Sequence, residues 1–159
     1  MAQKYHLAQL NVARAKAPVD DPIMQGFASR LAQINALADA APGFIWRLKD
    51  DQGDATSIRA FDDALILVNM SVWESIEALK HYVYRTAHAE LLRDRRSWFE
   101  QFSGAMLAMW WVPAGHIPSV EEAKERLAHL EQHGPSAYAF TFRTLHEPAA
   151  GVQHAVSGG

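Results

Sequence analysis

The chain contains no cysteine among its 159 residues. Composition alone therefore excludes disulfide bonds, thiolate nucleophiles, iron–sulfur clusters and cysteine-based zinc sites. No apolar run approaches the ~18 residues that a membrane-spanning helix needs. The N-terminal residues also lack the basic start and apolar stretch of a secretory signal. We therefore expect a cytoplasmic location and no membrane partner.

The sequence also lacks a large excess of charge of one sign. The 15 basic and 18 acidic residues give a formal net charge of −3, and no block of Lys or Arg occurs. Nucleic acid is therefore not an expected partner. The glycine-rich motifs of nucleotide binding, the serine elbow of hydrolases and the histidine spacing of zinc enzymes are absent from the sequence as well. We expect no dedicated metal site.

What the sequence does contain is apolar material, at 49% of residues, together with five Trp and eight His. This length and composition predict one domain with a sizeable core. We place that domain at residues 1–146. Residues 147–159 have little bulky apolar content and several glycines, so we expect a loose C-terminal tail.

Alternation of side chains predicts strands, and apolar spacing of three or four residues predicts helices. The predicted strands are Tyr5–Ala13, Phe44–Lys49, Thr56–Arg59, Leu65–Trp73, Met106–Val112 and Tyr138–Arg143. The predicted helices run from an Asp21 cap to Pro42, from Glu74 to Tyr84, from a Thr86 cap to about Phe102, and from a Ser119 cap to Gly134.

This order contains the β-α-β-β-α-β core of a ferredoxin-like α+β fold, with helices on one face of an antiparallel sheet. Bulky residues such as Leu67, Trp110 and Phe140 lie on predicted strands and cannot all be buried under a single helical layer. We therefore expect the second face to be covered by another copy of the chain, giving a homodimer through the sheet faces.

The segment VWESIEAL at residues 72–79 resembles the Trp-Glu-x-x-x-x-Leu step of the dimeric α+β barrel superfamily. That superfamily includes antibiotic-biosynthesis monooxygenases and haem-degrading monooxygenases. The segments YHLAQLNVAR, PGFIWRL, SVWESIEAL and WWVPAGHIPSVEEAKERL resemble more closely a bacterial domain-of-unknown-function family within that superfamily. This closer likeness covers residues 4–143 and implies a dimeric α+β barrel.

The resemblance also implies site residues. In the haem-degrading members an Asn, a Trp and a His work together, and Asn11, Trp73 and His88 are the nearest matches here. These three are our candidate catalytic residues. His88, or His81 on the preceding helix, would also be the ligand if haem binds.

Further candidates come from the residues themselves, and we assign them to substrate binding. An aromatic-lined pocket between sheet and helices would use Trp98 and Trp111, since only one of the neighbouring pair Trp110 and Trp111 can face it. Asn69, within the strongest strand, needs a polar partner if buried. Arg47 and Arg95 suit an anionic group of a ligand. A purely structural role in the core or the dimer contact remains open for the aromatic residues.

Three functional hypotheses follow. The first is a small-molecule-binding protein that acts as a monooxygenase on an apolar or aromatic substrate without a tightly held cofactor. The second is a haem-binding or haem-degrading protein. The third is a non-catalytic dimeric binding module.

Overall fold

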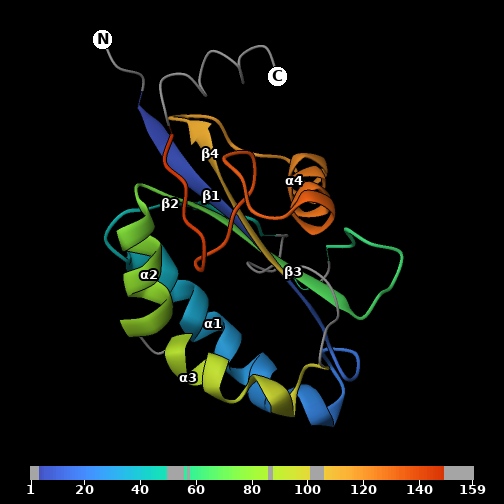
Figure 1. Cartoon of the computed structure of the whole chain (residues 1–159). Helices are drawn as coiled ribbons and strands as arrows, with labels where there is room; N and C mark the ends of the chain where they lie inside the picture. The colour runs from blue at the N-terminus through green and yellow to red at the C-terminus, as the bar shows by residue number, and fades with distance from the viewer. Residues whose placement is uncertain (1–3, 50–55, 57, 86–87, 101–105, 149–159) are drawn as a thin grey trace.

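The sheet of the computed structural model has four strands in the order β2–β3–β1–β4, and all neighbouring pairs are antiparallel (Figure 1). The structure describes residues 4–49, 56, 58–85, 88–100 and 106–148. The strands are β1 (Tyr5–Arg14), β2 (Phe44–Arg47), β3 (Ile66–Trp73) and β4 (Leu107–Pro113). This strand order confirms the α+β ferredoxin-like fold.

Four α-helices complete the described elements: α1 (Gln25–Ala40), α2 (Ile76–Arg85), α3 (His88–Arg93) and α4 (Val120–His133). Short 3₁₀ turns precede α1 at Pro22–Met24 and follow α3 at Arg95–Ser97. Two of the expected caps form: Asp21 accepts a hydrogen bond from the Ile23 N–H at 3.0 Å, and Ser119 accepts one from the Glu122 N–H at 3.0 Å. In the described ranges, no helix combines the length and apolar character needed to cross a bilayer.

The two faces of the sheet are covered by different helices. Helices α1, α2 and α3 lie on one side, and α4 lies on the other (Figure 1). We call these the α1 face and the α4 face. The helices of the ferredoxin-like core thus lie on one face as expected, but the additional helix α4 covers part of the face that we assigned to a second copy. Dimerisation through the sheet faces stays a prediction.

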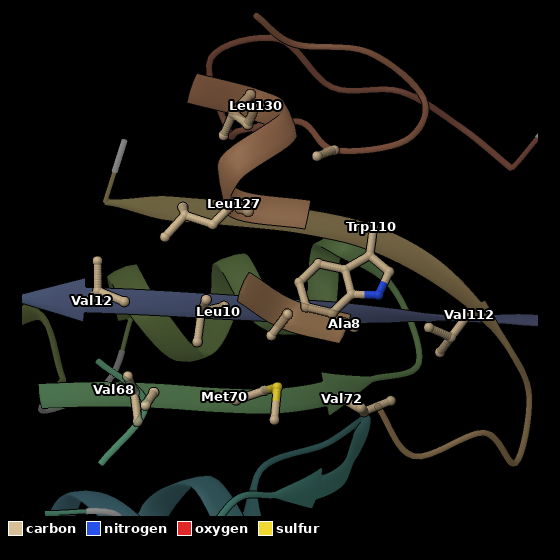
Figure 2. Packing of buried hydrophobic residues seen from close by; sticks show 14 residues of the cluster. Ala8, Leu10, Val12, Val68, Met70, Val72, Trp110, Val112, Leu127 and Leu130 are labelled. Carbon is tan, nitrogen blue, oxygen red and sulfur yellow. The ribbon is translucent and has the colours of Figure 1, made fainter. Parts of the chain in front are cut away.

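The α4 face is packed with aliphatic side chains from three strands. Leu10 of β1 and Met70 of β3 point to the same side as Trp110 of β4, and Leu127 of α4 packs over them (Figure 2). Trp110 is completely buried, as is Phe140 on the α1 face. Both residues therefore have the core role that large aromatic side chains usually have.

Three predicted elements differ from the structure. The helix expected from Thr86 to Phe102 is only the six-residue α3 and a 3₁₀ turn, because the chain becomes extended where Phe99 bridges Ala15. Thr86 and Phe102 lie outside the described residues. The strand expected at Tyr138–Arg143 is reduced to isolated bridges, one of them joining Phe140 to Met109. Ile58 and Arg59 form no strand.

Residues 149–159 of the predicted tail also lie outside the described part of the chain. The boundary between the domain and the tail therefore stays a prediction.

Gly43 lets the start of β2 approach α2 closely. Its φ of +85° is a conformation that residues with a side chain rarely adopt, and an added Cβ would lie 2.5 Å from the Cβ of Ala78. The Gly43 carbonyl also accepts a hydrogen bond from the Glu74 N–H at 2.8 Å. A glycine is therefore required at the point where β2 meets the start of α2.

Candidate functional site

A row of polar side chains crosses the middle of the α1 face. The register of β1 and β3 places Gln9 opposite Ser71 and Asn11 opposite Asn69. Because alternate residues of a strand share a face, all four point to the same side as Trp73. Gln9 and Ser71 are each only 5% exposed, whereas Asn11 and Asn69 are exposed. The row therefore leads from a buried aromatic residue to the surface.

Hydrogen bonds join this row into one network. The Gln9 Nε2 group donates to Asn69 Oδ1 and to Ser71 Oγ, each at 2.7 Å. The Trp73 Nε1–H donates to the same Ser71 Oγ at 2.8 Å. Ser71 therefore uses both lone pairs of its hydroxyl, and toward any further partner it can act only as a donor.

Aromatic contacts hold Trp73 rigidly at the buried end of the row. Its ring stacks on Tyr82 at 5.1 Å between centroids and meets Phe44 edge to face at 5.4 Å. The Tyr82 hydroxyl donates to the carbonyl of Ile34 on α1 at 3.0 Å, and burial raises the pKa of this hydroxyl. Trp73 is therefore fixed by both α1 and α2, and Tyr82 stays neutral.

Arg47 lies beside the row on the neighbouring strand, opposite Ser71 in the β2–β3 register. Its guanidinium is bidentate with Asp39 of α1, at 2.7 Å and 3.3 Å. The Arg47 side chain is only 11% exposed, and its hydrogen bonds hold the pKa of Asp39 below the usual value. Any anionic ligand group would have to compete with this carboxylate for Arg47.

The candidate residue Trp98 lies apart from this network. Trp98 is 6% exposed in a separate cluster with Met24, Phe27 and Leu67 toward the far end of the face. Arg30 lies over its ring, with the guanidinium carbon 5.3 Å from the centroid.

Of the neighbouring pair Trp110 and Trp111, Trp111 is the one on the α1 face. It packs at the edge of the Trp73 cluster, whereas Trp110 belongs to the α4 face. The Trp111 Nε1–H donates to the carbonyl of His146 at 2.8 Å, and its ring is 6.4 Å from that of Phe140. The C-terminal segment thus packs against Trp111.

The structure therefore brings only part of the predicted site together. Asn11, Asn69, Trp73 and Arg47 share the α1 face, while Trp98 belongs to a different cluster from Trp73. Arg95 is exposed in the 3₁₀ turn after α3. His88 begins α3, but its side chain lies outside the described part of the structure.

Sequence reasoning missed the centre of the network. Ser71 is not among the residues that the sequence predicts for the site, and the helix cap next to it is Ser75, which accepts from the Ala78 N–H at 3.1 Å. The signal was present: Asn69, Ser71 and Trp73 alternate along one strand and must share a face.

The surroundings of His81 do not fit a haem. His81 is exposed, at the edge of a surface depression of about 390 Å³ lined also by Pro42, Gly43, Glu74, Ser75, Glu77 and Ala78. Two carboxylates and an open surface do not provide the apolar pocket that holds a haem. Within the described residues, no group of three or more His, Asp or Glu side chains is placed to hold a metal ion.

The fold and the polar row together define an α+β ferredoxin-like protein with a candidate ligand site between its sheet and its first helices. The chain belongs to the family described as a domain of unknown function, DUF3291, whose family model matches residues 6–156. This confirms the predicted membership in a domain-of-unknown-function family. A search of curated proteins finds no match to the chain.

Solved structures with a similar fold include three bacterial proteins. A protein of unknown function from Nitrosomonas europaea is 16% identical over 74% of this chain and 99% of its own, with a TM-score of 0.45. A putative antibiotic biosynthesis monooxygenase from the same organism is 12% identical over 75% and 98%, with a TM-score of 0.46. SnoaB, a cofactor-independent oxygenase from Streptomyces nogalater, is 16% identical over 74% and 100%, with a TM-score of 0.45.

Proposed function

We propose that this protein binds a small apolar or aromatic molecule over the polar row of the α1 face and oxidises it without a tightly held cofactor. The observation that carries the proposal is the network from Trp73 through Ser71 and Gln9 to Asn69. Polar groups at the centre of a sheet face reduce the apolar burial that stabilises a fold, so a row that ends at exposed amides is better explained by a ligand.

The proposed chemistry uses the substrate as the source of electrons. An activated CH₂ group reacts with O₂ to give a C=O group, and the second oxygen atom leaves as water, so atoms and electrons balance. Asn69 and Asn11 would hold the substrate oxygen, and Trp73 would anchor the buried end of the network that orients Asn69. We assign the proton transfer to His88, which begins α3.

The test uses 2-tetralone, in which an aromatic ring is fused to a cyclic ketone. The CH₂ group between the aromatic ring and the carbonyl is the activated one. Binding is measured by calorimetry, and incorporation of ¹⁸O from ¹⁸O₂ is measured by mass spectrometry. We expect saturable binding and labelled product, and in Asn69→Ala roughly tenfold weaker binding with a corresponding loss of labelled product. Gln132→Ala, a change of an exposed residue on α4, is the matched control and should retain both.

Each other outcome favours a different function. Binding without labelled product would identify a non-catalytic binding module, and absence of both would contradict the proposal. Haem binding through His88 is the second hypothesis, and a haem titration without a Soret shift in the wild-type protein would rule it out.

We also propose that a second copy covers the part of the α4 face left by α4. Helix α4 packs on β4 and β1, while Trp46, Leu48, Phe61 and Ile66 are only partly buried toward the β2–β3 side. Burying these apolar side chains would favour association. Sedimentation should show a dimer at micromolar concentration that Ile66→Lys dissociates, and a wild-type monomer would contradict this assembly.

A further inference from the structure

The Gln9 side chain determines the direction in which hydrogen bonds are donated in the network, which we call its polarity. Both hydrogens of its Nε2 group are used, one toward Asn69 Oδ1 and one toward Ser71 Oγ. The two acceptors are two residues apart on β3, so they lie on the same face and a single amide group can reach both. Gln9 is 5% exposed, which leaves its amide little freedom to turn.

This arrangement fixes the direction of the Asn69 amide. Because Asn69 Oδ1 is occupied by Gln9, its Nδ2 group points away from the network. Asn69 is exposed, so the Nδ2 hydrogens are the part of this amide that is available to a ligand. The Ser71 hydroxyl, with both lone pairs occupied, can likewise offer only its hydrogen.

The reverse polarity is less favourable. If both amides were turned over, Gln9 would accept from Asn69 and Ser71, and its own two N–H groups would have no described acceptor on a side chain that is only 5% exposed. Buried N–H groups without a partner are rarer in proteins than under-used carbonyl oxygens. The Trp73 N–H donates to Ser71 Oγ in both arrangements and therefore does not distinguish them.

We propose that Gln9 is a positioning residue that holds the Asn69 amide with its NH₂ group outward, so that the site selects ligands with a hydrogen-bond acceptor oxygen, such as a carbonyl. The ligand selection rests on the function proposed above. The orientation of the amide does not, and it can be tested without any ligand.

The first experiment measures exchange with water of the side-chain NH₂ hydrogens in ¹⁵N-labelled protein by NMR. We expect the Gln9 hydrogens, both hydrogen-bonded, to exchange at least roughly tenfold more slowly than those of Asn69. Fast exchange at Gln9 with protection at Asn69 would show the reverse polarity and overturn the proposal.

Two variants at one position sharpen this measurement. In Gln9→Glu the new carboxylate can only accept, so Asn69 must turn, and its NH₂ exchange should slow by roughly tenfold. Gln9→Met has a similar volume and no hydrogen bond, and there the exchange at Asn69 should stay fast. If Gln9→Glu does not fold, the wild-type pattern alone decides the orientation.

The second experiment compares two matched ligands, 2-acetylnaphthalene and 2-ethylnaphthalene, which differ in the carbonyl oxygen. The wild-type protein should bind the ketone roughly tenfold more tightly, and Gln9→Met should reduce this ratio to about twofold. Equal binding of the two ligands by the wild-type protein would overturn the selection. Failure of both ligands to bind, with the expected exchange pattern, would refute the proposed function and the ligand selection, while the positioning role of Gln9 would stand.

Discussion

The two faces of the sheet use the same three long strands for different purposes. On the α4 face the alternate residues are apolar from Ala8 to Val12 of β1, from Ile66 to Val72 of β3 and from Ala108 to Val112 of β4, and they pack into one continuous cluster (Figure 2). On the α1 face the apolar residues form two separate clusters, around Trp73 and around Trp98, and the polar row lies between them in the strands. The α4 face therefore contributes continuous apolar burial that stabilises the fold. The α1 face instead has polar side chains at its centre, which end at exposed amides.

The largest expected effect on stability is on the α4 face. Trp110→Ala should lower the free energy of unfolding by about 3–5 kcal/mol, because it removes a fully buried ring from the cluster. It also leaves the Glu122 carboxylate without the Trp110 N–H, which donates to it at 2.9 Å. Urea denaturation measures the change, and a loss below about 1 kcal/mol would show that this face is not the main core.

The close approach of β2 to α2 at Gly43 can be tested by comparing two glycine substitutions. Gly43→Ala should destabilise by about 2 kcal/mol or more, because it combines positive φ with a contact of 2.5 Å to Ala78. Gly115→Ala is the matched control, since its φ is +96° and nothing lies within 4 Å of the added Cβ. It should cost only about 1 kcal/mol, and thermal denaturation compares the two. Equal losses would mean that β2 and α2 separate easily.

Ser71, at the centre of the polar row, should contribute less to the free energy of unfolding than Trp110 or Gly43. Ser71→Ala leaves the Trp73 N–H and one Gln9 hydrogen without their acceptor, which should cost about 1–3 kcal/mol in urea denaturation. Ser75→Ala is the matched control, because the same substitution there removes only a helix cap. Urea denaturation should show a loss of about 1 kcal/mol for this variant. A stabilised Ser71→Ala would show that the network opposes folding.

The smallest expected effect on stability is at the surface end of the row. Asn69→Ala should change the free energy of unfolding by less than about 0.5 kcal/mol, because the side chain is exposed. Calorimetry with 2-acetylnaphthalene should nevertheless show roughly tenfold weaker binding. A large loss of stability with unchanged binding would place Asn69 in the core and not in a site.

Much of this contrast could be predicted from the sequence. The alternation of Tyr5–Ala13 predicted β1, and the apolar residues of Leu65–Trp73, interrupted only by Asn69 and Ser71, predicted β3. The sequence could not show that a helix of the same chain covers the second face. The stripe of α4 is apolar whether its partner is this sheet or a second copy.

The polar row could be predicted only in part. Alternation places Gln9 with Asn11 on one strand and Asn69 with Trp73 on another, but the pairing of the two strands depends on register. The register that sets Gln9 opposite Ser71 results from long-range packing, which no local pattern contains. The end of the 3₁₀ turn at Ser97 depends in the same way on a distant bridge between Phe99 and Ala15.

One further feature affects how the protein behaves at high concentration. Phe140 pairs with Met109 in both directions, at 2.8 Å and 2.9 Å, on the outer side of β4. This contact occupies hydrogen-bonding groups in the middle of a border strand. Sheets that join strand to strand into filaments need unpaired groups at both borders, so occupying one border is enough to end such growth. We therefore expect the C-terminal segment to hinder the addition of a further strand at the middle of this border, besides packing against Trp111.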